Sequence, residues 1–156
     1  MRKFLLSLAV LGFIALASAH TVPPRVGLSV RHSAGSAYQN LIRFLELAIT
    51  NCKNLKYFRL ITKEYSDPKN PDQQKTNLGQ IRADLERRYI VVSIKYEDTL
   101  HDRRIYLSYG YIIKIGRGLH FYKAANPMYS IGLVNYKYRK CLQTDVDVWR
   151  NNSTAS

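Results

Sequence analysis

The strongest pattern along the chain is an alternation of apolar and polar positions in residues 105–115. The positions on one side of this alternation are Ile105, Leu107, Tyr109, Tyr111, Ile113 and Ile115. A two-residue period of this kind is typical of a half-buried β-strand. The strand is followed by Gly116-Arg117-Gly118 and by the aromatic segment 119–123. Together these features predict a central hairpin that turns at the two glycines.

A second pattern has the spacing of an α-helix and begins at Ser36. Ser36 and Gln39 form a capping box, which is a signal for a helix start. One apolar stripe then runs along the segment at helical spacing and consists of Tyr38, Leu41, Ile42, Leu45, Ala48, Ile49 and Cys52. We expect an amphipathic helix that packs on a sheet, with Cys52 at its buried edge.

Shorter patterns predict the remaining elements. Apolar or β-branched runs indicate strands at 26–30, 56–62 and 89–96, and a weaker helical pattern covers 76–88. Residues 66–72 are rich in Pro and Asx residues and are expected to form a loop. Residues 128–142 fit either a strand or a helix. The expected fold class is α+β, with a mixed, mostly antiparallel sheet and an amphipathic helix packed on it.

The first 19 residues have the pattern of a secretory signal peptide. A basic start is followed by an apolar run and by Ala17-Ser18-Ala19, which fits a cleavage site before His20. The run is shorter than the ~20 apolar residues that a membrane span needs. We therefore predict a secreted, extracellular protein with one domain at 20–150 and no transmembrane segment after cleavage. The polar tail, 151–156, contains overlapping glycosylation sequons at Asn151 and Asn152.

The charge of the chain narrows the choice of partners. The leader holds two of the 24 Lys and Arg residues and none of the 11 acidic ones, so the rest carries 22 against 11, a net of +11. Such a chain attracts anionic glycans, nucleic acids or acidic surfaces, although a basic surface can also serve solubility alone. The polyanion-binding candidates lie among tyrosines in the second half and are Lys114, Arg117, Lys123, Lys137, Arg139 and Lys140.

The chain has two cysteines, Cys52 and Cys141. In an oxidising compartment the simplest prediction is a disulfide between them, and a catalytic thiol is the alternative. No metal-binding thiol spacing is present, and no cofactor is predicted. His20 is a candidate for copper binding because an amino-terminal histidine offers both its amine and its imidazole.

Several segments resemble the ribosome-inactivating proteins, the family of the ricin and Shiga toxin A-chains. The resemblance involves Leu28-Ser-Val30 with the helix from Ser36, the strand at 88–94 and the hairpin at 105–122. It implies the N-terminal part of that fold, with Tyr111 and Tyr136 as the pair of rings that stack on an adenine. The chain stops before the helix that carries the catalytic Glu and Arg of that family, so the resemblance implies a scaffold without N-glycosidase activity.

These observations lead to one expected function and two alternatives. We expect a secreted, basic, non-catalytic effector, similar in character to salivary vasoactive or anti-haemostatic proteins of blood-feeding insects. It would act as a monomer on an extracellular protein receptor, an anionic glycan or a nucleic acid. The alternatives are a toxin that depurinates ribosomal RNA and a secreted copper-binding protein that uses His20.

Overall fold

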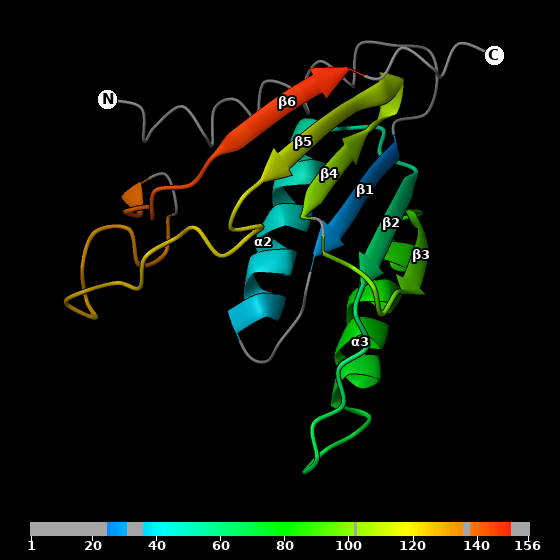
Figure 1. Ribbon diagram of the computed structural model, residues 1–156, viewed down its shortest axis with the longest axis horizontal. Helices are drawn as coiled ribbons and strands as arrows, with labels where there is room; N and C mark the ends of the chain where they lie inside the picture. Colours follow the sequence, from blue (N-terminus) through cyan, green and yellow to red (C-terminus); the bar gives the residue numbers. More distant parts are fainter. Residues whose placement is uncertain (1–24, 31–35, 102, 136–137, 151–156) are drawn as a thin grey trace.

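The computed structural model has a six-stranded mixed sheet covered by two helices, and it describes residues 25–30, 36–101, 103–135 and 138–150. The strand order is β3-β2-β1-β4-β5-β6 (Figure 1). The predicted α+β class and the mixed sheet are confirmed. Two of the five strand pairings are parallel and three are antiparallel.

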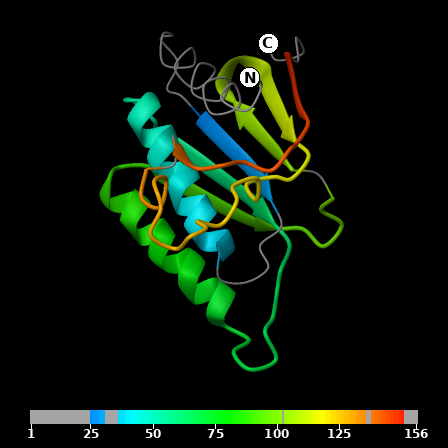
Figure 2. The same ribbon diagram turned by 90° about the vertical axis from the view of Figure 1, so that its left-hand side faces the viewer.

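The parallel half of the sheet is built from two successive strand–helix–strand units. Strand β1 (Arg25–Val30) leads to helix α2 (Ser36–Asn51), and β2 (Tyr57–Thr62) leads to α3 (Gln73–Arg87) and then to β3 (Val91–Tyr96). Both steps across the sheet run in the same direction. Since such crossovers are right-handed, both helices lie on the same face of the sheet, as Figure 2 shows.

The antiparallel half differs from the predicted hairpin. Residues 105–115 form two strands, β4 (Arg104–Leu107) and β5 (Tyr111–Ile115), joined by a 3-10 turn at Ser108–Gly110. Gly110 has a φ of 79°, which favours glycine and allows the chain to reverse there. The hairpin turn predicted at Gly116–Gly118 is therefore wrong. The other neighbour of β5 is β6 (Val146–Arg150), which pairs with it antiparallel about thirty residues later in the chain.

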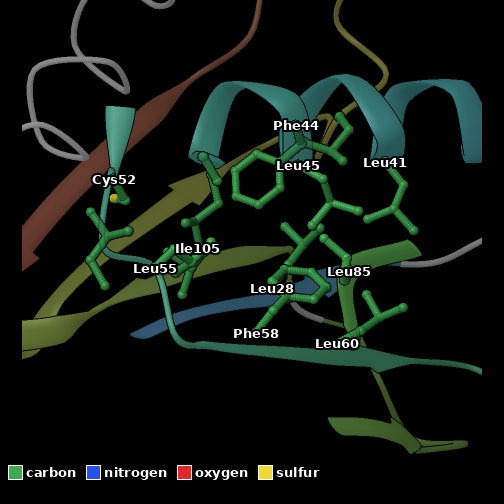
Figure 3. Packing of buried hydrophobic residues seen from close by; sticks show 14 of the residues in the cluster. Leu28, Leu41, Phe44, Leu45, Cys52, Leu55, Phe58, Leu60, Leu85 and Ile105 are labelled. Carbon is green, nitrogen blue, oxygen red and sulfur yellow. The ribbon is translucent and has the colours of Figure 1, made fainter. Parts of the chain in front are cut away.

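The hydrophobic core lies between the sheet and the two helices. From α2 it takes Leu41, Phe44, Leu45 and Ala48, and Cys52 directly after the helix adds to it. Figure 3 shows several of these side chains over residues of the central strands such as Leu28 and Phe58. The predicted helical stripe is thus confirmed apart from Ile42, which is 43% exposed, while Phe44 takes a buried position.

The face of the sheet opposite the helices carries the alternate side chains of each strand. Lys114 is exposed between the buried residues Ile113 and Ile115, and it lies beside Arg104 and Asp147 in the strand register. Among the described residues, no helix is long and apolar enough to cross a membrane.

Candidate functional site

The segment after β5 makes a tight turn that positions two arginines. Gly118 has a φ of 58°, and a Cβ atom there would lie 2.9 Å from Cδ of Arg103, so only glycine lets this arginine pack closely. Arg103 donates a hydrogen bond from Nη1 to the carbonyl oxygen of Gly116 at 2.7 Å. The amide of Ile115 in turn donates to the carbonyl of Arg103. The Arg103 side chain is thereby fixed at the end of β5.

Arg117 is held from the other side of the turn. Its amide donates to Oγ1 of Thr144 at 3.1 Å, and its Nε donates to the carbonyl of Gln143 at 2.9 Å. These two contacts orient the exposed guanidinium at the end of the sheet, although the segment is not the hairpin tip that the sequence predicted. A guanidinium so oriented can accept a phosphate or carboxylate through its remaining N–H groups.

Helix α2 approaches the same end of the sheet. The amide Nδ2 of Asn40 lies 3.5 Å from Nδ1 of the exposed His120, and Arg43 donates from Nη1 to Oδ1 of Asn40 at 3.1 Å. The amide of His120 also donates to the carbonyl of Arg117. A continuous set of contacts thus connects α2 to the turn after β5, which Figure 1 places at the same end of the molecule.

Two lysines complete this end of the molecule. The amide of Lys123 donates to the carbonyl of Lys140 at 2.8 Å, next to the isolated bridge between Tyr122 and Cys141. Both lysines are exposed. We use the name basic rim for the residues that these contacts gather: Arg43, Arg103, Arg117, His120, Lys123 and Lys140.

The charges around the basic rim are strongly asymmetric. Residues 103–144 contain eight Lys and Arg and no Asp or Glu. The ion pairs between described residues join side chains of α3, β3 and the loops that flank these two elements. In the same described part of the chain, no carboxylate lies within ion-pair distance of Arg117, Lys123 or Lys140. The rim therefore has a positive field that is directed at solvent.

The polyanion-binding candidates from the sequence are distributed over several places. Arg117, Lys123 and Lys140 lie on the basic rim, whereas Lys114 lies on the open face of the sheet. Arg139 turns inward and donates to three backbone carbonyls. Lys137 lies outside the described residues.

The structure describes only one of the two tyrosines predicted to form an adenine clamp. Tyr111 is partly buried against the core, and the guanidinium of Arg150 lies 5.5 Å from the centre of its ring. Tyr136 lies outside the described residues, as do His20, Asn151, Asn152 and the signal peptide predicted at 1–19.

Cys52 and Cys141 are not bonded to each other in the structure, and the disulfide between them stays a prediction. Cys52 is buried at the end of α2, and Cys141 is half-buried beside Tyr122. Burial raises the pKa of the Cys52 thiol to about 11. Because the thiolate is the reactive form, Cys52 is poorly suited to be the catalytic thiol considered as an alternative. The described residues contain no group of three or more side chains suited to bind a metal ion.

Sequence reasoning missed three members of the basic rim, Arg103, His120 and Arg43, and also Asn40, which contacts two of them. The acid-free stretch at 103–144 was a usable signal for the first two. For the two α2 residues no signal was available, because only the packing of α2 against the segment after β5 brings them to the rim.

Comparisons with known proteins identify relatives of a different kind from those expected. Residues 33–150 match the model of the family described as "Phospholipase D-like domain at C-terminus of MIT". MIT domain-containing protein 1 of Mus musculus is 34% identical over 115 residues, which cover 74% of this chain and 46% of the mouse protein. The chain thus spans about half the length of that relative.

These findings correct the expectations drawn from tyrosine and apolar patterns. The resemblance to ribosome-inactivating proteins is wrong, and so are the functions of a secreted effector or a ribosomal RNA toxin. The comparisons do not support a copper-binding protein either. The segments at 36–45, 88–94 and 105–122 were similar only in residue types that many buried strands and amphipathic helices share.

Proposed function

Because this chain belongs to the family of phospholipase D-like domains at the C-terminus of MIT, we propose that it binds anionic phospholipid headgroups at its basic rim. The observation that carries the proposal is the acid-free stretch at 103–144, from which the fold places Arg103, Arg117, Lys123 and Lys140 on the basic rim. Basic side chains near an anionic leaflet each stabilise binding by about 1 kcal/mol. The name of the family supports the same class of ligand.

The geometry of the rim is better suited to binding a membrane surface with many headgroups than to enclosing a single ligand. Lys123, Lys140 and the guanidinium of Arg117 are all exposed and are spread along the end of the sheet. Such an arrangement attracts phosphates mainly through long-range charge, which salt screens beyond about 10 Å at 0.1 M ionic strength. We therefore expect binding that depends steeply on both anionic lipid content and salt.

A matched pair of variants tests the proposal by cosedimentation with vesicles of equal parts phosphatidylserine and phosphatidylcholine. Lys123→Gln with Lys140→Gln is expected to weaken binding by about 2 kcal/mol, roughly thirtyfold, because two rim charges are lost. Lys53→Gln with Lys56→Gln removes two exposed lysines at the opposite end of the sheet. This control is expected to change binding less than about twofold at 0.1 M salt.

The same experiment decides between lipid and other anions. Equal losses in the two variants would show that net charge, and not the rim, drives binding. An anionic glycan or a nucleic acid would also be attracted by this charge. Tighter binding to heparin or to single-stranded RNA than to the vesicles, at equal salt, would contradict the proposal.

A further inference from the structure

Part of the irregular segment between β5 and β6 exposes several large apolar side chains. It extends from Lys123 to Lys140 and is closed at its base by the bridge between Tyr122 and Cys141. We call the described residues of this segment, 123–135 and 138–140, the apolar loop. Its described large apolar side chains are all exposed, five of them at 62% or more, and are Met128, Tyr129, Ile131, Leu133, Val134 and Tyr138. Exposed apolar side chains gathered in one loop are typical of an interaction site.

The loop is held in shape from the inside by Arg139. Its guanidinium donates to the carbonyl of Gly132 from Nε at 2.6 Å, to that of Lys123 from Nη1 at 3.1 Å and to that of Leu133 from Nη2 at 2.8 Å. The amide of Leu133 donates in turn to the carbonyl of Ser130. Several backbone polar groups are thus satisfied within the loop while the apolar side chains point outward.

Glycine is required at one point of this arrangement. Gly132 is buried with a φ of 96°, and a Cβ atom there would lie 2.8 Å from the carbonyl oxygen of Tyr138. The two limbs of the loop therefore approach each other closely, and the backbone turns inward. Carbonyls that are hydrogen-bonded inside the loop cost less free energy to move out of water, which suits a segment that contacts the outer part of a bilayer.

The charges at the base of the loop indicate which kind of surface the apolar side chains contact. Lys123 and Lys140 flank its two ends and belong to the basic rim. In Figure 1 the loop (orange) lies to the left of α2, off the end of the sheet at which β6 begins and away from β3 and α3. Lysines beside an apolar segment suit the boundary between headgroups and acyl chains, where their charged ends reach phosphates.

We infer that the apolar loop inserts its exposed side chains into the outer part of an anionic bilayer while Lys123 and Lys140 contact the headgroups. This inference rests on the proposed function. It adds that the domain penetrates the bilayer surface and does not only contact the headgroups. Insertion of an interfacial segment reaches about 5–10 Å into the headgroup and acyl boundary. Charge brings the domain to the membrane, and burial of the loop then slows its release.

A matched pair of substitutions tests the inference with vesicles of phosphatidylserine and phosphatidylcholine. Tyr129→Ser with Val134→Ser removes side chains that are 85% and 88% exposed, and we expect at least a tenfold loss of vesicle affinity, about 1.4 kcal/mol of lost apolar burial. Tyr89→Ser with Val91→Ser makes the same chemical change at side chains that are 84% and 59% exposed, on and beside β3. The control should bind vesicles like the parent chain.

Fluorescence measures insertion directly and does not depend on the affinity. The chain has a single tryptophan, so Val134→Trp combined with Trp149→Phe places one reporter on the loop. We expect its emission to shift to shorter wavelength on vesicles and to be quenched by lipids brominated in the acyl chains. Unquenched emission from vesicle-bound protein would overturn the inference.

The outcomes separate this inference from the proposed function. If the parent chain does not bind anionic vesicles, the proposed function fails. If it binds and the loop variant binds equally well, the inference fails while the proposed function stands. Concentration-dependent self-association in solution that the loop variant abolishes would also overturn the inference, because the loop would then contact a second copy.

Discussion

Replacing Leu28 by alanine is expected to lower the free energy of unfolding by about 2–5 kcal/mol. Leu28 is 1% exposed and lies in the middle of β1, opposite Leu60 of β2 and Ile105 of β4. Figure 3 shows it under the side chains of α2. Truncation removes apolar contacts and leaves a cavity at the junction of the parallel and antiparallel halves, where neighbouring strands are least able to move in.

Urea denaturation followed by circular dichroism measures this change. The control Val91→Ala shortens a side chain that is 59% exposed on the edge strand β3, and it should change stability by less than about 0.5 kcal/mol. Equal effects of the two substitutions would contradict the assignment of the core to the layer between the sheet and the helices.

Arg139→Lys is expected to disorder the apolar loop although it preserves the charge. Lysine cannot reproduce the planar guanidinium that donates to the carbonyls of Gly132, Leu133 and Lys123. Hydrogen bonds from a charged donor are worth about 1.5–3 kcal/mol each when buried, and less here because two of the three are exposed. The peptide bonds that follow Tyr129 and Tyr138 should then become accessible to chymotrypsin, because the backbone around them can open.

Limited proteolysis measures the effect of this substitution on the order of the loop. We expect cleavage within 123–140 to accelerate roughly tenfold or more, since local opening needs about 1.4 kcal/mol less free energy. Arg87→Lys is the matched control, because Arg87 is an exposed arginine that donates to a single backbone carbonyl. Unchanged cleavage of the Arg139 variant would show that the loop does not depend on this side chain.

Much of the fold could be predicted because its elements carry strong local signals. The stripe of α2 and the apolar runs of β1, β2 and β3 were located to within a few residues. The turn at Ser108–Gly110 was missed for a physical reason. The inward positions before and after the turn stay in phase, so the alternation from Ile105 to Ile115 does not reveal that the chain reverses between them.

Residues 128–142 show a second limit of sequence periodicity. Their apolar side chains suggested an element of secondary structure, but the segment is a loop whose shape depends on Arg139 and Gly132. Prediction from periodicity assumes that apolar side chains are buried. It therefore cannot recognise a loop whose apolar side chains face solvent. The composition of residues 103–144 did indicate a basic site, whereas its assembly with Arg43 and Asn40 depends on tertiary packing.

Hydrogen exchange on anionic vesicles tests the central claim most directly, because it locates the surface that meets the membrane. We predict that binding slows exchange in residues 116–123 and in the described parts of the apolar loop, and leaves α3 and β3 unchanged. Protection confined to α3 and β3, or binding without protection at the rim, would contradict the account.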